Sequence, residues 1–99
     1  MKSKFISIII PVFNEQGSIE HLYKKLKSVL DRVKHEIIFV DDGSTDGSWQ
    51  IEKDLAKNNP GKVRAIKLKK NFGKATALNL GFKNSKNDII ITLDADLQD

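Results

Sequence analysis

The stretch EIIFVDDGSTDGS, residues 36–48, joins an apolar run to a turn with three aspartates and two glycines. The run at 36–41 is rich in β-branched and aromatic residues, which is typical of a buried strand. A helix is expected to begin near Asp46 or Ser48 and to end near Asn58, where NNPG follows. Adjacent carboxylates at a strand end either bind a ligand or only shape the turn.

The alternation of strand and helix continues on both sides of this stretch. Further strands are predicted at residues 5–10, 63–68 and 88–93, the first of these being a nearly continuous apolar run and the third another strand of the buried type. A first helix is predicted after Ser18, a candidate cap, because apolar residues recur at helical spacing over four turns. These residues are Ile19, Leu22, Tyr23, Leu26, Val29, Leu30 and Val33. A third helix is predicted with Ala75, Leu78 and Phe82 on one face.

The order β-α-β-α-β-α-β with short connections predicts an α/β fold with a Rossmann-like parallel sheet and right-handed crossovers. The chain has 99 residues, enough for one domain, so residues 1–99 are predicted to form a single unit. It has no Cys, which excludes disulfides and thiolate metal sites. Its apolar runs are too short for a membrane span. Its net charge is +4, but the sequence contains no known nucleic-acid-binding motif. The basic excess is typical of a solvated surface, or it attracts phosphates.

Polar clusters follow three of the four predicted strands, at their carboxyl ends. These are PVFNE at 11–15, DDGSTDGS at 41–48 and DADLQD at 94–99, whereas the turns at the opposite ends are unremarkable. Ligands of open α/β sheets bind beyond the carboxyl ends of the strands. Neither a G-x-G-x-x-G nor a complete P-loop motif is present. The clusters therefore predict a ligand site of another kind at this edge.

The acids of these clusters are expected to do different work. Asp94 and Asp96 point to the same side of an extended backbone, and Gln98 continues that side. Such oxygen ligands suit Mg²⁺ or Mn²⁺ and leave positions open for a diphosphate. In the turn, a ligand role is favoured for Asp42. Its neighbour Asp41 is expected to be tied to backbone N–H groups, and Asp46 is expected to start the helix.

Four motifs in register, SIIIPVFNE, FVDDGSTDGS, KNFGKATALNLGF and TLDADLQD, resemble the N-terminal nucleotide-binding half of inverting glycosyltransferases of the GT-A fold, family 2. The longer N-F-G-K-x-x-A-L-N-x-G-F signature with D-A-D-L-Q-D is most similar to the polyprenyl-phosphate branch. That branch includes dolichyl-phosphate mannose synthases and undecaprenyl-phosphate glucosyl- or aminoarabinosyl-transferases. Phe13 stands where many members have Tyr, and Lys70 where the branch often has Arg, which bears on the identity of the base.

The resemblance implies a nucleotide-sugar site with a DXD motif and a strand order of 3-2-1-4. The implied nucleotide-sugar-binding residues are Pro11, Phe13, Glu15, Val40, Asp42, Asp94, Ala95, Asp96 and Gln98. Asp96, with Gln98 and Asp94, would hold Mg²⁺ or Mn²⁺, and Asp96 is the catalytic residue that the resemblance implies.

The function implied is metal-dependent, inverting transfer of a hexose from a UDP- or GDP-sugar, with a polyprenyl phosphate at the cytoplasmic face of a membrane as acceptor. Family members are longer, so the chain is expected to be an N-terminal fragment that is inactive alone. No nucleic-acid partner is expected. In the order 3-2-1-4 the strand at 88–93 becomes a sheet edge, which predicts self-association through it. The alternative is a non-catalytic α/β binding or assembly module whose acids only cap helices.

Overall fold

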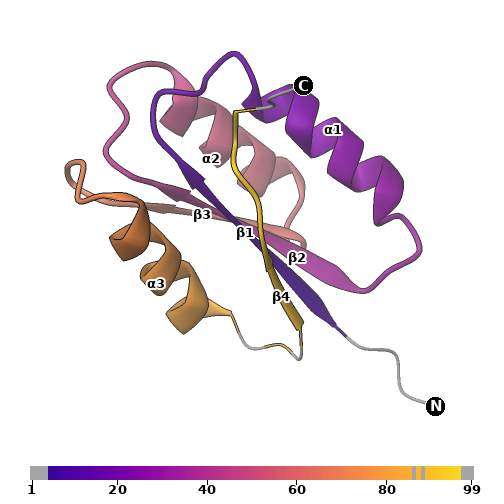
Figure 1. Cartoon of the computed structure of the whole chain (residues 1–99). Coiled ribbons are helices and arrows are strands. Elements are labelled where there is room, and N and C mark those ends of the chain that lie inside the picture. Colours follow the sequence, from indigo (N-terminus) through magenta and orange to yellow (C-terminus); the bar gives the residue numbers. More distant parts are fainter. Residues whose placement is uncertain (1–4, 86, 88, 97–99) are drawn as a thin grey trace.

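A computed structural model describes residues 5–85, 87 and 89–96 of the chain. Strands and helices alternate from one end to the other, as the sequence predicts (Figure 1). The elements are β1 (Ile6–Val12), α1 (Ile19–Val29), β2 (His35–Asp41), α2 (Ser48–Asn58), β3 (Val63–Lys67), α3 (Lys74–Asn84) and β4 (Ile89–Thr92).

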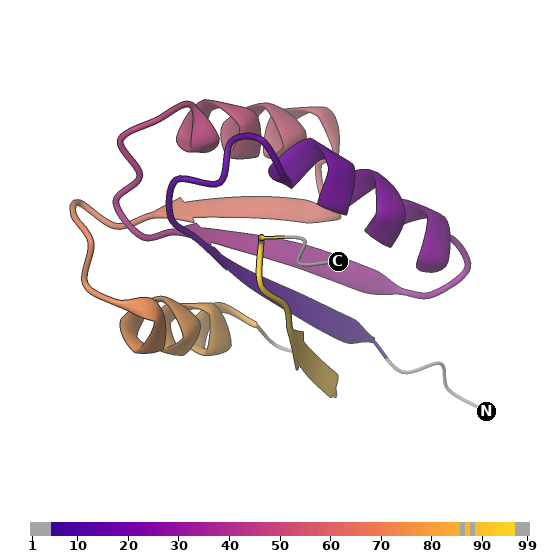
Figure 2. The same cartoon turned by 45° about the horizontal axis from the view of Figure 1, so that its top comes forward.

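The strands form one parallel sheet in the order β3-β2-β1-β4. This order confirms the predicted 3-2-1-4 arrangement and the α/β fold class. The helices cover both faces of the sheet, with α1 and α2 on one side and α3 on the other (Figure 2). One core cluster lies under α1 and α2 around Ile8, Ile10 and Phe39, and the other lies under α3 around Ile9 and Ile38. Alternate residues of the central strands are therefore buried on opposite faces, which explains why those strands are apolar throughout.

The strand β1 continues through Pro11 to Val12, whereas the sequence predicts that Pro11 closes it. Pro11 pairs with Val40 of β2, but the pairing of β1 with β4 ends at Ile9. Proline has no N–H to donate, so it is tolerated in a strand where one side lacks a neighbour. Pro11 lies in such a position, beyond the stretch of β1 that β4 covers.

The helix α1 is shorter than its apolar pattern predicts. It ends at Val29, with Leu30 as its C-cap, and Val29 is 76% exposed. Val33 instead closes a turn by donating its N–H to the Leu30 carbonyl, at 2.9 Å. At the other end Ser18 occupies the N-cap position, but its side chain makes no cap hydrogen bond. Among the described residues no helix is long and apolar enough to cross a membrane.

The face through which α3 packs on the sheet agrees only in part with the predicted one. Leu78 packs against the core, but Phe82 is 42% exposed, and the buried residues are Ala77 and Gly81. A Cβ at Gly81 would lie 2.4 Å from Cγ2 of Ile9, so this glycine allows the close approach of α3 to β1. Small residues therefore form the centre of the contact face, which periodicity alone does not reveal.

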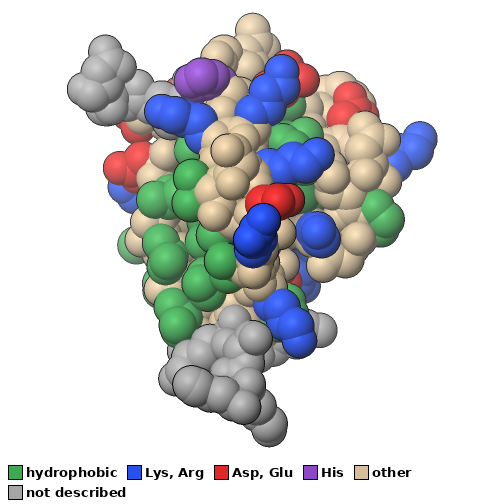
Figure 3. Space-filling view, turned by 90° about the vertical axis from the view of Figure 1, so that its right-hand side faces the viewer, with side chains coloured by type: hydrophobic (Ala, Val, Ile, Leu, Met, Phe, Trp, Pro, Cys, Tyr) green, Lys and Arg blue, Asp and Glu red, His purple; other side chains and the backbone are tan. Residues whose placement is uncertain are grey.

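The strand β4 forms an open edge of the sheet. Its isoleucines Ile89, Ile90 and Ile91 are each exposed by 38% to 41%. Figure 3 looks onto this side of the molecule and shows hydrophobic side chains gathered there. Unpaired backbone groups beside apolar side chains make an edge that can pair with another strand.

Near the amino ends of the strands, a buried polar cluster holds β4 and α3 against the sheet. Glu36 is 6% exposed and accepts hydrogen bonds from Ser7 Oγ (2.8 Å), Arg64 Nη2 (3.0 Å) and Asn87 Nδ2 (2.8 Å). Arg64 also donates to the carbonyl of Asn84 at the end of α3. This end of the sheet, which is unremarkable in sequence, therefore has a structural role.

The Glu36→Ala variant is expected to lose about 2 kcal/mol of unfolding free energy. Removing one partner of a buried ion pair leaves the other charge uncompensated, and the half-exposed Arg64 limits the loss. Urea denaturation measures this value, with the exposed Asp31→Ala as a control expected to stay within about 0.5 kcal/mol of the wild type. Equal stability of the two variants would contradict the structural role of the cluster.

Candidate nucleotide-binding site

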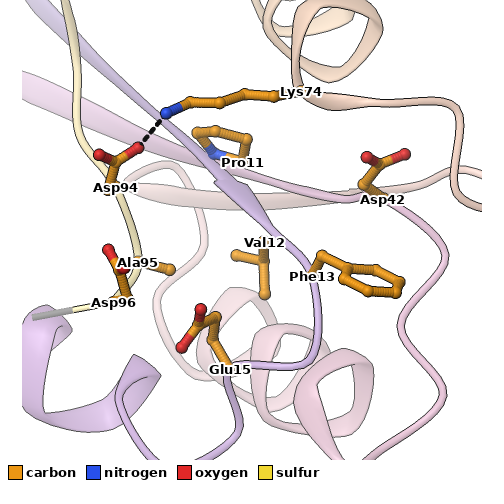
Figure 4. Close-up of a pocket in the computed structure, with 9 residues that line it drawn as sticks. All are labelled: Pro11, Val12, Phe13, Glu15, Asp42, Lys74, Asp94, Ala95 and Asp96. Carbon is orange, nitrogen blue, oxygen red and sulfur yellow. Dashed lines mark hydrogen bonds and ion pairs between the residues drawn. The ribbon is translucent and has the colours of Figure 1, made fainter.

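A pocket of about 340 Å³ opens at the carboxyl ends of the strands, where the three polar clusters meet (Figure 4). The residues that follow β4 form one side of it, Asp42 at the end of β2 lies on the other, and the end of β1 passes between them. The lining residues are Pro11, Val12, Phe13, Glu15, Asp42, Lys74, Asp94, Ala95 and Asp96.

The loops after β1 and β2 are joined by hydrogen bonds through Asn14. Its backbone adopts a left-handed conformation (φ 52°), which asparagine tolerates better than most residues. Its N–H donates to Ser44 Oγ at 2.9 Å, and its Oδ1 accepts from the N–H groups of Thr45 (2.8 Å) and Asp46 (3.3 Å). This side chain fixes the loop after β1, which carries Phe13 and Glu15 into the pocket.

A second set of contacts orders the start of α2. Asp46 accepts the N–H of Ser48 at 2.8 Å and that of Gln16 at 3.3 Å, which agrees with its predicted role in starting the helix. Burial opposes its ionisation, but these bonds and one from the Ser48 hydroxyl outweigh that effect and lower the pKa of Asp46. Ser48 Oγ in turn accepts the N–H of Glu15 at 2.9 Å.

The adjacent aspartates of the turn face different partners. Asp41 is fully buried, and its Oδ2 accepts the N–H of Ser44 at 2.8 Å, which confirms the predicted turn role. Asp42 accepts the N–H groups of Phe72 (2.8 Å) and Gly73 (3.0 Å) and also lines the pocket. It therefore ties the loop before α3 to the sheet, a contact that the sequence alone did not suggest.

The pocket contains side chains of both charges, since Lys74 lies among the remaining acids. Lys74, at the start of α3, forms an ion pair with Asp94. Glu15 and Asp96 lie on the same side of the pocket (Figure 4). Partial burial, followed by the negative charges of Asp96 and Asp46, raises the pKa of Glu15. A ligand that carries a cation next to anionic oxygens would relieve this repulsion and also meet Lys74.

The structure brings together most of the residues predicted for the site. Those that line the pocket are Pro11, Phe13, Glu15, Asp42, Asp94, Ala95 and Asp96. Val40 does not line the pocket, because its side chain is fully buried and packs with Ile9, Ile38 and Ala77 in the core under α3. Its part in the base pocket stays a prediction. Gln98 lies outside the described residues.

Lys74 and Val12 line the pocket although the sequence did not single them out for it. Lys74 lies in the quoted KNFGK motif, one residue after a glycine and at a predicted helix start, and this position could have drawn attention to it. Asn14 was missed as an organising residue, and its signal is weaker because any polar residue after a strand suits a loop.

No group of three or more His, Asp or Glu side chains arranged to hold a metal occurs in the part of the chain that the structure describes. Asp94 and Asp96 nevertheless supply two carboxylates at one edge of the pocket. Two hard oxygen ligands with open positions fit Mg²⁺ or Mn²⁺ held jointly with phosphate oxygens and do not form an all-protein cage.

The chain thus has an α/β fold with a polar pocket at the carboxyl ends of its parallel strands, and comparison with known proteins gives the family. Residues 7–99 match the family described as glycosyl transferase family 2. The chain belongs to this family, and the solved structures that resemble it are GT-A glycosyltransferases.

Curated relatives agree with the branch that the motifs suggest. An undecaprenyl-phosphate 4-deoxy-4-formamido-L-arabinose transferase from Edwardsiella ictaluri is 42% identical over 97 residues, which cover 96% of this chain and 30% of the relative. The transferase of the same name from Aeromonas hydrophila is 39% identical over 97 residues, covering 96% of this chain and 30% of the relative. The chain thus spans about 30% of the length of the curated relatives it matches.

Solved structures of related fold contain nucleotides and metal. The mannosyltransferase PcManGT from Pyrobaculum calidifontis, in complex with GDP-Man and Mn²⁺, matches with a TM-score of 0.79 and 29% identity over 97% of this chain and 28% of its own. Glucosyl-3-phosphoglycerate synthase from Mycobacterium tuberculosis, in complex with Mn²⁺, UDP and phosphoglyceric acid, matches with a TM-score of 0.74 and 26% identity over 94% of this chain and 33% of its own.

Proposed function

We propose that the chain is the nucleotide-sugar-binding part of a metal-dependent inverting glycosyltransferase that transfers a sugar from a UDP- or GDP-sugar to a polyprenyl phosphate. The observation that carries the proposal is the pocket, in which acids from the loops after β1, β2 and β4 meet Lys74. Membership of glycosyl transferase family 2 and the ligands of the solved relatives support it.

In this proposal the polar and aromatic residues of the pocket have separate tasks. Phe13 and Glu15 flank the base and ribose of the nucleotide, and Asp42 contacts the base. Asp96, with Asp94 and Gln98, would hold a divalent metal at the diphosphate. When bound, such a metal neutralises the charge that develops on the departing nucleoside diphosphate. Lys74 adds a fixed positive charge next to Asp94 and so favours phosphate oxygens at that side.

The proposed acceptor explains why no separate general base is needed in these residues. A phosphomonoester has a second pKa of about 6, so a polyprenyl phosphate is largely dianionic at neutral pH. It attacks the anomeric carbon directly, and a single in-line displacement inverts the configuration there. The acceptor's lipid chain places the reaction at a membrane surface, and we assign it to the cytoplasmic face.

The direct test is calorimetric titration of the chain with UDP, GDP and their hexose derivatives, with and without Mn²⁺ or Mg²⁺. Wild-type chain is expected to bind a nucleotide in a metal-dependent manner, and Asp96→Ala is expected to weaken that binding more than tenfold because a carboxylate ligand is lost. The exposed Asp54→Ala on α2 serves as a matched control and is expected to bind like the wild type.

A folded chain that binds none of these nucleotides, while a full-length relative measured in parallel does bind, would favour the alternative of a non-catalytic α/β module. Circular dichroism establishes that each variant is folded. If nucleotide binding depends on the metal ion equally in Asp96→Ala and in the wild type, Asp96 is not a ligand of the proposed metal.

Self-association of the 99-residue chain through β4 belongs to the same proposal. The edge strand carries Ile89, Ile90 and Ile91 at 38% to 41% exposure, beside unpaired backbone groups. Pairing of two such edges satisfies the backbone groups and covers the isoleucines, so a second copy of the chain is the proposed occupant.

Sedimentation equilibrium is expected to show dimers or larger species of the chain at high concentration. The Ile90→Lys variant is expected to shift the population toward monomer, because a charge at the edge opposes pairing. Val29→Lys is the matched control, since Val29 is 76% exposed but lies on α1. A monomeric wild type at the highest soluble concentration would contradict the proposed pairing.

A further inference from the structure

Two buried carboxyl groups lie behind the turn that carries Asp42. Asp41 ends β2 and Glu52 lies in the second turn of α2, and both residues are 0% exposed. Asp41 Oδ2 accepts the Ser44 N–H. Asp41 Oδ1 and both carboxyl oxygens of Glu52 lack a hydrogen-bond donor within the described part of the chain.

The Glu52 carboxyl lies near that of Asp41, and two ionised carboxylates have no hydrogen to share. Burial, the hydrogen bond that a protonated Glu52 can make to Asp41, and the negative charges of Asp41 and Asp46 raise the pKa of Glu52 to about 10. The opposing charge is Lys67 on β3, whose ammonium lies over the ring of Trp49, 5.7 Å from its centroid. A single proton on Glu52 removes the repulsion and supplies the missing donor.

We propose that Glu52 is a positioning residue of the nucleotide site: as a neutral acid it donates its hydrogen to Asp41 Oδ1 and so holds the turn that presents Asp42 to the pocket. The inference rests on the proposed function only for the role of Asp42 as a nucleotide contact.

Observed hydrogen bonds connect Asp41 to the loops around the pocket, and the proposed bond adds Glu52 to them. With Oδ1 held by Glu52, Asp41 keeps Oδ2 on the Ser44 N–H. Ser44 Oγ in turn accepts the N–H of Asn14 from the loop after β1. Asp42 follows directly and binds the loop before α3 through the N–H groups at 72 and 73. Loss of the Glu52 hydrogen would leave Asp41 Oδ1 buried without a partner, at the base of the turn that joins all three loops.

Infrared difference spectroscopy tests the protonation without any nucleotide. At pH 7 the wild-type spectrum is expected to contain the C=O stretch of a protonated carboxylic acid, and that band is expected to disappear in Glu52→Gln. The matched control Asp54→Asn changes an exposed acid two residues away on the same helix and is expected to retain the band. Absence of the band from the wild type, or its persistence in Glu52→Gln, would overturn the inference.

Titration with UDP and GDP in the presence of Mn²⁺ tests the positioning role. Glu52→Gln retains a donor for Asp41 and is expected to bind within threefold of the wild type. Glu52→Leu fills a similar volume without a donor and is expected to weaken binding more than tenfold, with its fold verified by circular dichroism. Equal binding by both variants would show that Glu52 does not position the site.

The two readouts separate the inference from the proposed function. A wild type that binds no nucleotide refutes the proposed function, while the infrared band still decides whether Glu52 carries the proton. If Glu52→Leu does not fold, the positioning role is judged from Glu52→Gln: affinity more than tenfold below the wild type, with the band absent, would contradict it.

Discussion

Glu52→Gln is expected to make the chain progressively more stable than the wild type as the pH rises above about 4.5. The pKa of Glu52 is about 10 in the folded chain against an ordinary value of 4.5, so between these values the folded state holds a proton that the unfolded state has lost. Stability therefore falls with rising pH in the wild type, by up to about 1.4 kcal/mol per pH unit from this group alone. Glutamine has no proton to lose, so the variant escapes this decline.

Urea denaturation of both chains at several pH values, from about 3.5 to about 9, measures the effect. The informative quantity is the difference between the two unfolding free energies, because every other titrating group contributes equally to both. The difference is expected to be flat below about pH 4.5, where both states carry the proton, and to grow above it. Asp54→Asn, which changes an exposed acid, serves as the control. If the unfolding free energies of Glu52→Gln and the wild type change in parallel with pH, Glu52 ionises normally in the folded chain.

Gly43→Ala is expected to lower the free energy of unfolding by about 3 kcal/mol or more, from two additive causes. Gly43 has φ +76°, a left-handed conformation that costs about 1 kcal/mol or more with a Cβ. In addition, a Cβ there would lie 2.3 Å from the backbone carbonyl carbon of Lys70. Because the obstacle is backbone, relief requires moving the loop before α3 away from the turn, together with its bonds to Asp42.

Alanine substitutions at two further glycines measure the two contributions separately. Gly61 has φ +84°, but no atom lies within 4 Å of the position that a Cβ would take, so Gly61→Ala measures the backbone conformation alone, at about 1 kcal/mol. Gly17 is crowded by nothing within 4 Å and has no left-handed φ, so Gly17→Ala is expected to stay within about 0.5 kcal/mol of the wild type. If Gly43→Ala costs no more than Gly61→Ala, the contact between the two loops is not rigid.

The prediction of the fold succeeded where local pattern and chain connectivity act together. Apolar strands of 5–10 and 36–41 and the turns between elements were enough for a parallel sheet, and the resemblance supplied its strand order. The prediction failed for the ends of some helices and strands and for the helix face that packs on the sheet. The apolar spacing continues to Val33, but α1 ends at Val29, and both of these valines are exposed.

The site was predicted through side-chain chemistry, and its organisation was not. Carboxylates after three strands indicate a ligand edge, since parallel strands bring their carboxyl ends together. Val40 was expected to contact the base, but tertiary packing buries its side chain against Ile9, Ile38 and Ala77. The pairing of Glu52 with Asp41 brings together residues of α2 and β2, and nothing in the spacing of the two identifies it.

Local pattern in the chain alone thus established the order of strands and helices and the acids at the carboxyl edge of the sheet, where ligand binding is proposed, because these depend on periodicity and on strand direction. Tertiary packing alone decided which carboxylates are buried, which are tied to backbone N–H groups and which face the pocket. The stretch at 36–48 illustrates the division: its three aspartates look alike in sequence. They differ because other segments approach them: Glu52 lies near Asp41, the N–H groups of Phe72 and Gly73 bind Asp42, and the N–H of Gln16 binds Asp46.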